Sequence, residues 1–270
     1  MLFETFRLAL QAIFRNALRS FLTVLGIVIG VGAVISMVTV GQGSADQVTA
    51  DVEKLGANTL MVLPGEDPMG GGAPGTAVAM FTLRDNDAVH EQISSVAVSA
   101  PISQIRSRVV FGNENRQTDI VGTDNRYFEA AQWEFALGRP FTPAEIQSGR
   151  PVCVIGETVH DTLFSGRDPI GETVRIKTLS CEVIGLLQSK GASTFGSDQD
   201  DFVIMPLRTF QRRIAGNNDV SVLFVSVREG VSTERTAEEI EALMRQRRRI
   251  SSGEQDDFDV VDMKQLATML

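Results

Sequence analysis

The segment Phe21–Val40 reads FLTVLGIVIGVGAVISMVTV, and it decides how the chain is organised. It lies within a run from Ser20 to Ala45 that holds no charged residue. A helix of about twenty residues is about 30 Å long, which is the thickness of the hydrocarbon core of a bilayer. The few Thr and Ser hydroxyls can hydrogen-bond to the helix backbone, so they do not oppose insertion. The segment therefore predicts a transmembrane helix over residues 21–43.

Two alternatives to a transmembrane helix are a buried helix of a soluble protein and a cleaved signal peptide. The length and purity of the apolar run disfavour the first. A signal-peptide core is typically about 7–15 residues long, which disfavours the second. The preceding residues also have a helical pattern, because Phe3, Phe6, Leu10 and Phe14 recur at steps of three and four. Residues 1–20 therefore predict an amphipathic helix that lies in the membrane interface on the cytoplasmic side.

The charge of the chain is distributed unevenly along its length. The 270 residues include 25 basic and 34 acidic side chains, for a net charge of −9. Residues 1–20 hold three arginines and one glutamate, a net charge of +2, which leaves −11 on the rest. The positive-inside rule then predicts a cytoplasmic N-terminus and an acidic body outside the membrane. An acidic body also argues against nucleic-acid binding, which requires a basic surface.

Two further patterns concern the span and its continuation. Gly26, Gly30 and Ala33 place small residues on one face, as in helices that pack closely within membranes. Glycine is common in spans, so an incidental pattern is an equal alternative. Apolar residues continue at helical spacing through residues 44–56, where Gly56 is a natural C-cap. Residues 44–56 therefore predict a stalk helix that continues the span.

Beyond the stalk, short apolar strands alternate with short helices, which predicts an α/β (α+β) extracytoplasmic domain. Residues 113–200 are richer in short strands and turns, so we expect them to form a subdomain inserted between residues 57–112 and 201–262. The expected helices are 83–92 with Thr82 as N-cap, 125–131, 157–164, 207–214 and 233–249. The expected strands are 59–63, 95–98, 103–111, 117–122, 151–156, 173–177, 181–187, 202–206, 221–227 and 258–261.

Motifs of catalysis and nucleotide binding are missing from the sequence. A phosphate-binding loop requires a Gly-Lys pair, and the chain contains none. The only histidines, His90 and His160, lie in no zinc-ligand spacing, and no Gly-x-Ser-x-Gly elbow occurs. We therefore predict no catalytic, cofactor or metal site. The acidic cluster of Asp198, Asp200 and Asp201 favours a solvated turn over a calcium loop.

The predicted helix 233–249 begins with glutamates and ends with arginines, from Arg245 to Arg249. This order suits the helix dipole, so the arginines indicate a helix end rather than a nucleic-acid patch.

Cys153 and Cys181 are the only cysteines, and both fall in apolar runs that predict strands. An oxidising compartment permits a disulfide between them. Two buried free thiols are the equal alternative, because strand adjacency cannot be inferred from sequence.

Several segments together resemble MacB-type ABC transporter permeases. The resemblance begins at the start of the chain, with FRLALQAIFRNALRSFLTVLGIVIGVGAVISMVTVGQG followed by LGANTLMVLPG. It continues through GTDNRYFE, LGRPFT, PVCVIGETV, LFSGRDPIGETVRI, CEVIGLL, GSDQDDFVIMPL and QRRIAG. The resemblance implies four spans, with a large periplasmic domain between the first and the second. Residues 57–112 and 201–262 would then be a porter-like α/β subdomain, with 113–200 inserted.

The chain departs from the family pattern in two ways. It has one predicted span, and residues 263–270 would begin a return stalk toward a second span, so we expect a truncated form. It also carries no nucleotide-binding domain, so the resemblance implies that a separate ABC ATPase subunit binds the ATP.

The resemblance implies a permease of the cell inner (plasma) membrane, with its main body in the periplasm. Such a permease would form a homodimer and couple ATP hydrolysis to efflux. Its other partners would be a periplasmic adaptor (membrane fusion) protein and, in a cell with two membranes, an outer-membrane channel. The alternatives are a relative that releases lipoproteins or regulates a cell-wall hydrolase, and a membrane-anchored binding or sensor module.

Overall fold

The structure is a computed structural model, and it describes residues 17–54, 58–65, 80–192, 198–263 and 265. The chain divides into two compact units, Met1–Ala50 and Asp51–Leu270. Residues 1–16 of the predicted interfacial helix lie outside the described residues. The same is true of the end of the predicted stalk, residues 55–57, and of nearly all of the predicted return stalk at 263–270.

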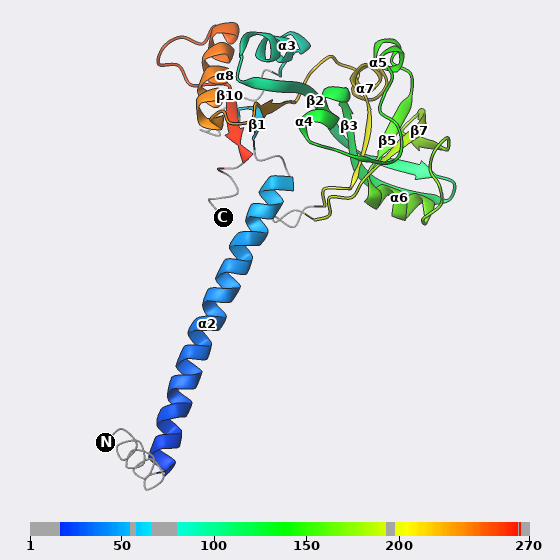
Figure 1. Ribbon diagram of the computed structural model, residues 1–270. Helices are drawn as coiled ribbons and strands as arrows, with labels where there is room; N and C mark the ends of the chain where they lie inside the picture. Colours follow the sequence, from blue (N-terminus) through cyan, green and yellow to red (C-terminus); the bar gives the residue numbers. More distant parts are fainter. Residues whose placement is uncertain (1–16, 55–57, 66–79, 193–197, 264, 266–270) are drawn as a thin grey trace, which may run out of the picture. The chain divides into compact units, whose positions relative to one another are not determined.

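The described part of the first unit belongs to helix α2 (Ala17–Lys54). The helix runs without interruption through the predicted span and through the predicted stalk as far as Lys54 (Figure 1). No Pro occurs between these residues, so nothing in the sequence breaks the ladder of backbone hydrogen bonds. The chain is therefore one helix from Ala17 to Lys54, and its division into span and stalk stays a prediction.

The second unit is built on a mixed sheet with ten described strands (Figure 1). The order is β10-β1-β9-β2-β3-β8-β5-β7-β4, and β6 pairs with both β2 and β7. Most neighbours are antiparallel, while β3–β8 and β5–β7 are parallel. The strands are β1 Thr59–Pro64, β2 Val96–Phe111, β3 Glu114–Thr123, β4 Phe135–Gly138, β5 Val152–Ile155, β6 Thr173–Ile176, β7 Leu179–Leu187, β8 Phe202–Pro206, β9 Val222–Val227 and β10 Phe258–Asp262.

Strand β2 corrects the expectation of two separate strands at 95–98 and 103–111. Its residues 96–102 pair with β9, and its residues 103–111 pair with β3. Pro101 lies in the part that pairs with β9, before the register with β3 begins at Ser103. A proline is tolerated where its missing N–H is not needed by a second neighbour. The strand therefore continues through Pro101 and exchanges partners there.

The helices follow the predicted positions closely. They are α3 Leu83–Gln92, α4 Asn125–Ala130, α5 Pro143–Ser148, α6 Glu157–Phe164, α7 Leu207–Phe210, the π-helix η1 Gln211–Ala215 and α8 Thr233–Arg248. Thr82 is the N-cap of α3, as expected. The predicted helix 207–214 changes to π geometry after Phe210. Helix α5 and the short edge strand β4 were missed, although the Thr-Pro-Ala-Glu that opens α5 is a capping box.

Side chains alternate between the two faces of the sheet and form three buried clusters. One cluster joins β1, β9 and β10 to α3 and α8 on one face. A second joins β3, β5, β7 and β8 to α6, α7 and η1. The third cluster lies on the opposite face of the sheet and draws side chains from both groups of strands. It also contains Phe128 of α4 and Ile146 of α5. The third cluster therefore joins the two ends of the sheet, each of which also has a cluster of its own.

The predicted insertion, residues 113–200, begins at the turn between β2 and β3. Strand β8 follows the predicted end of the insertion, yet it lies between β3 and β5. Phe210 and Ile214 also pack with strands of the insertion. The division into subdomains stays a prediction, and these contacts bring residues 202–214 to the side of the insertion.

The turn from β5 into α6 depends on Gly156. A Cβ atom at this position would lie 2.1 Å from the carbonyl oxygen of Asp200. We expect Gly156→Ala to lower the free energy of unfolding of the domain by about 1–3 kcal/mol, because backbone must move to admit the methyl group. Chemical unfolding of the purified chain measures the change.

Gly166→Ala is the matched control. Gly166 has φ +78° and open space around it. Gly166→Ala therefore introduces left-handed backbone strain without a steric clash, and we expect it to lower the free energy of unfolding by about 1 kcal/mol. A Gly156→Ala protein as stable as the wild type would contradict the close packing of Asp200.

Candidate functional site

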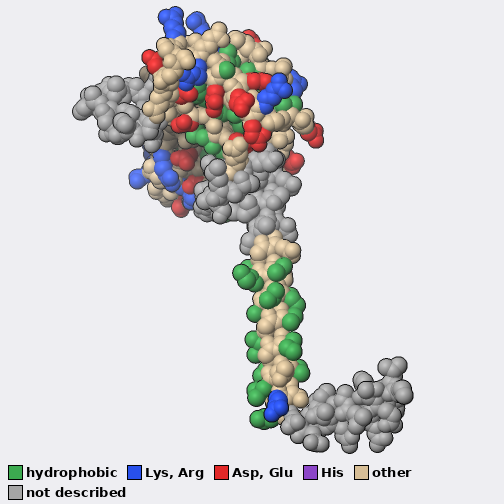
Figure 2. Space-filling model, turned by 90° about the vertical axis from the view of Figure 1, so that its left-hand side faces the viewer, with side chains coloured by type: hydrophobic (Ala, Val, Ile, Leu, Met, Phe, Trp, Pro, Cys, Tyr) green, Lys and Arg blue, Asp and Glu red, His purple; other side chains and the backbone are tan. Residues whose placement is uncertain are grey.

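The first candidate region is the surface of α2. Residues 17–43 have the length and hydropathy of a membrane span, and none of the most apolar window is buried within the protein. Apolar side chains cover this helix on the side seen in Figure 2. Thr23 and Thr39 donate their hydroxyls to the carbonyls of Arg19 and Ile35 at 2.8 Å, as predicted. A long helix with an apolar, unburied surface is what a bilayer accommodates.

The residues predicted for helix packing all lie on this exposed helix. A Cβ atom added at Gly26 or Gly30 would meet nothing within 4 Å, and Ala33 is exposed. Their spacing of four and three residues places them on one face of α2. Their packing against another helix stays a prediction.

The second candidate region is a groove of about 610 Å³ in the second unit. Its walls come from α3, α4, α5, α7 and η1, together with Asn218. Arg208 and Arg212 line it beside Asp87 and Asp124, with a few apolar side chains such as Ile146. This mixture of charged and apolar side chains suits a polar, charged binding partner better than an apolar small molecule. The π-helix η1 lines one wall, and such segments are frequent at functional sites.

Arg126 connects two walls of the groove. Its guanidinium binds Asp124 at 2.7 Å and reaches Asp87 of α3 at 3.4 Å. Burial disfavours the charged guanidinium, but the hydrogen bonds and charges of the two carboxylates outweigh burial and raise the pKa of Arg126. The side chain therefore stays charged and ties the start of α4 to α3.

A second ion pair fixes α5, the wall that carries Ile146. Both carboxylate oxygens of Glu145 accept hydrogen bonds from Arg139 at 2.9 Å, and the Thr142 N–H donates to Glu145 at 2.8 Å. Glu145 is buried, with 5% of its surface exposed. The hydrogen bonds from Arg139 contribute most to lowering the pKa of Glu145 to about 2, against the opposing effect of burial.

The acidic cluster near residue 200 lies at a turn with Asp198 exposed, as expected, but Asp200 and Asp201 are not solvated in the way that a surface turn would leave them. Asp200 is 3% exposed and accepts hydrogen bonds from the Ser189 hydroxyl and from the N–H groups of Lys190 and Gly191. Asp201 forms a two-fold ion pair with Arg116 of β3 at 2.7 and 3.0 Å. The sequence could not show these donors, because they are distant along the chain.

The arginines at the end of α8 form ion pairs with residues around the helix. Arg245 binds Asp256, Arg247 binds Asp85 of α3 at 2.8 Å, and Arg248 binds Asp257 at 2.7 Å. The prediction of a helix end is confirmed, and these pairs leave less free positive charge for a polyanion.

Cys153 and Cys181 lie on the neighbouring parallel strands β5 and β7, and both are free thiols with no exposed surface. Cys153 lies opposite Val183, which places Cys181 diagonally across from it on the same face. Burial, and next the Cys153 thiol, raise the pKa of Cys181 well above its usual value. The thiols are close neighbours, and the disulfide itself stays a prediction.

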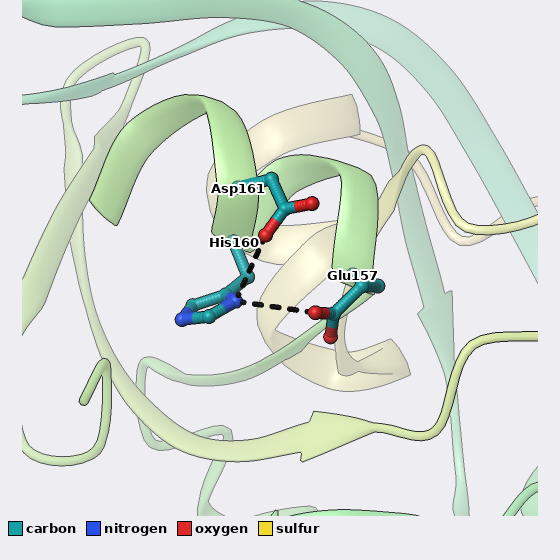
Figure 3. A group of neighbouring side chains, drawn as sticks. All are labelled: Glu157, His160 and Asp161. Carbon is teal, nitrogen blue, oxygen red and sulfur yellow. Dashed lines mark ion pairs between the residues drawn. The ribbon is translucent and has the colours of Figure 1, made fainter. Parts of the chain in front are cut away.

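The two histidines have different environments. His90 is exposed at the end of α3. His160 is buried in α6, where Glu157 and Asp161 lie beside it (Figure 3). The search for zinc motifs missed this group, because its spacing Glu-x-x-His-Asp matches none of the patterns considered. The signal available in the sequence was that positions i, i+3 and i+4 lie on one helix face.

The sequence profile of the MacB-like periplasmic core domain matches residues 20–243. The chain belongs to this family. It is 32% identical over 97% of its length to the macrolide export ATP-binding/permease protein MacB of Syntrophobacter fumaroxidans, and 35% identical over 97% to that of Chlorobium luteolum. The matches cover 44% and 39% of those proteins, so the chain spans about two fifths of the length of these relatives.

Solved structures support the MacB-like fold. The periplasmic region of MacB from Actinobacillus actinomycetemcomitans matches with a TM-score of 0.65 at 19% identity, over 82% of this chain and 96% of that one. The extracellular domain of the noncanonic ABC-type transporter YknZ from Gram-positive bacteria matches with a TM-score of 0.60, also at 19% identity, over 76% and 100%. The chain thus combines an apolar N-terminal helix with a MacB-like periplasmic core domain of mixed α/β fold. This confirms the family and the fold class expected from the sequence.

The Glu145–Arg139 pair generates a pH prediction. Because the folded protein holds the pKa of Glu145 below its unfolded value, the ionised carboxylate stabilises the fold above pH 5. That stability is lost as the pH falls from about 5 to about 2. We expect Glu145→Gln to lower the free energy of unfolding at pH 7 by about 2 kcal/mol. This is less than the full pKa shift would give, because Arg139 is half exposed and solvent screens the ion pair.

Unfolding of the wild-type and variant chains at pH 7, 5 and 3 measures this difference, which should shrink toward acid. Glu229→Gln is the control, because Glu229 is exposed. A difference between wild type and Glu145→Gln that is constant with pH would contradict the assigned ion pair.

Proposed function

We propose that the chain is the permease part of a MacB-type ABC transporter, with its N-terminus in the cytoplasm and its external domain in the periplasm. One observation carries the proposal: a single helix, Ala17–Lys54, leads from an apolar span toward a domain of the MacB-like family. A continuous helix transmits displacement, whereas a flexible linker would dissipate it. The arginines near the start of the chain support the cytoplasmic orientation.

In this proposal, ATP binds and is hydrolysed in an ABC ATPase in the cytoplasm. The names of the MacB relatives join an ATP-binding function to a permease function. The described domain offers grooves and ion pairs, and the sequence contains no phosphate-binding loop. We propose that closure of the ATPase pair moves α2 in a homodimer of permeases, and that Gly26, Gly30 and Ala33 let the spans pack closely.

The external domain would use this movement for efflux, in contact with a periplasmic adaptor protein and an outer-membrane channel. The MacB relatives are named as macrolide exporters, so macrolides are the first substrate class to test.

Co-purification from native membranes tests the proposal. The tagged natural gene product is gently solubilised. We expect it to bring down an ABC ATPase and an adaptor. The yield of adaptor should differ between samples with ATP plus vanadate and samples without nucleotide. Mass spectrometry identifies the partners. An ATPase without an adaptor would favour the lipoprotein-release or hydrolase-regulating role. A chain that is purified alone would contradict the transporter and favour a membrane-anchored binding module.

The role of α2 as a lever generates a second prediction. Val48→Pro would remove one backbone hydrogen bond in the helix and kink it beyond the span. In the reconstituted complex, we expect Val48→Pro to keep the basal ATPase rate but lose most of the stimulation by the adaptor. Coupled measurements of ATP hydrolysis with and without the adaptor detect this change.

Val48→Ala is the matched control, because it removes the same side chain but favours helix. It should keep the stimulation. Stimulation retained in both variants would contradict a rigid lever, while leaving the identity of the partners unaffected.

A further inference from the structure

The start of helix α6 brings three ligand-type side chains together. Glu157, His160 and Asp161 lie within one helical turn, and the side chains meet at the surface of the helix (Figure 3). The Nδ1 atom of His160 lies 3.6 Å from Glu157 Oε1 and 3.6 Å from Asp161 Oδ1. Two carboxylates therefore converge on one imidazole nitrogen.

The other nitrogen of the ring determines the state of Nδ1. His160 Nε2 lies 2.9 Å from the backbone carbonyl oxygen of Arg167. A carbonyl oxygen only accepts, so Nε2 carries a proton and, in the neutral ring, Nδ1 carries the lone pair. The side chain of His160 is nine-tenths buried, and its Nδ1 has no hydrogen-bond partner in the described structure. A buried polar atom aimed at two carboxylates therefore lacks a partner of its own.

The distances distinguish between two possible partners, a proton and a metal ion. A charged N–H···O hydrogen bond would be about 2.7–2.9 Å long, and one N–H can be directed at only one of the two carboxylates. Ligands at about 2.1 Å from a tetrahedral metal ion lie about 3.4 Å from each other. The two separations of 3.6 Å are close to that edge length, and the two carboxylate oxygens lie within 4.8 Å of each other.

We propose that Glu157, His160 and Asp161 bind a divalent transition-metal ion of the Zn²⁺ class. An imidazole nitrogen with carboxylate oxygens suits Zn²⁺, whereas Mg²⁺ and Ca²⁺ prefer oxygen ligands alone. The Arg167 carbonyl supplies the outer-shell acceptor that metal-bound histidines use to fix the ring. Glu157 and Asp161 are 36% and 69% exposed, so water can reach the metal and complete its coordination. This site revises the expectation, drawn from motif spacing, that the chain has no metal site.

The site goes beyond the transport function, because none of its atoms is needed for that proposal. All three ligands come from one turn of α6, and the ring of His160 stacks on Phe164 of the same helix. The metal would therefore hold the start of α6 in its helical form rather than join distant parts of the chain. Binding to the folded state would also raise the unfolding temperature in proportion to the logarithm of the zinc concentration above the Kd.

Calorimetric titration of the full-length chain in detergent with ZnCl₂ tests the site, using a tag without histidine. We expect one Zn²⁺ per chain, and at least about tenfold weaker binding in each of Glu157→Gln and Asp161→Asn. MgCl₂ and CaCl₂ should give no comparable binding. The matched control is His90→Gln with Glu91→Gln, which changes the same residue types at an exposed pair on α3 and should bind zinc as the wild type does.

Nuclear magnetic resonance of ¹⁵N-labelled histidine gives a second readout, because the chain contains only His90 and His160. Zinc should shift the Nδ1 signal of His160 and leave its Nε2 protonated. Circular dichroism checks that each variant is folded. Zinc binding that is equal in the wild type and in the folded Glu157→Gln and Asp161→Asn variants would overturn the proposal. So would an Nδ1 that carries a proton at pH 7.5 in the presence of zinc.

Discussion

The α/β domain depends on strand β2, which is long enough to pair with two different groups of strands. Its first half pairs with β9 and its second half with β3, so the backbone hydrogen bonds of one strand connect both ends of the sheet. The shared cluster on one face extends this connection to the side chains. Because β2 continues through Pro101 without a break, the strands before and after the predicted insertion are parts of one hydrogen-bonded structure.

Polar contacts inside this framework connect segments that are distant in sequence. Arg116 of β3 and Asp201, before β8, join neighbouring parallel strands, and Asp200 binds the chain that follows β7. The carbonyl of Asp200 in turn requires a glycine at residue 156, where α6 begins. The start of α6, the helix that carries His160, therefore packs closely against the backbone of Asp200. These residues give the domain a defined shape without forming a site of covalent chemistry.

Helix α2 and the α/β domain follow different physical rules. The surface of α2 is apolar and exposed, and the hydroxyls of Thr23 and Thr39 are satisfied within the helix. The α/β domain buries its apolar side chains in three clusters and exposes a mixture of acidic and basic side chains (Figure 2). In the proposed transporter, this difference allows one chain to transmit a displacement from the bilayer to a domain in water.

The sequence by itself determined the features that depend on neighbouring residues. The apolar run defined α2, local periodicity defined most helices and strands, and Thr82 was recognisable as a cap. Tertiary structure alone decided the features that depend on distant partners: the single strand through Pro101, the burial of Asp200 and the adjacency of Cys153 and Cys181. It also decided that the Arg167 carbonyl meets His160, which leaves Nδ1 facing two carboxylates. Helical spacing can place three side chains on one face, but only the folded chain sets their burial and their remaining hydrogen bonds.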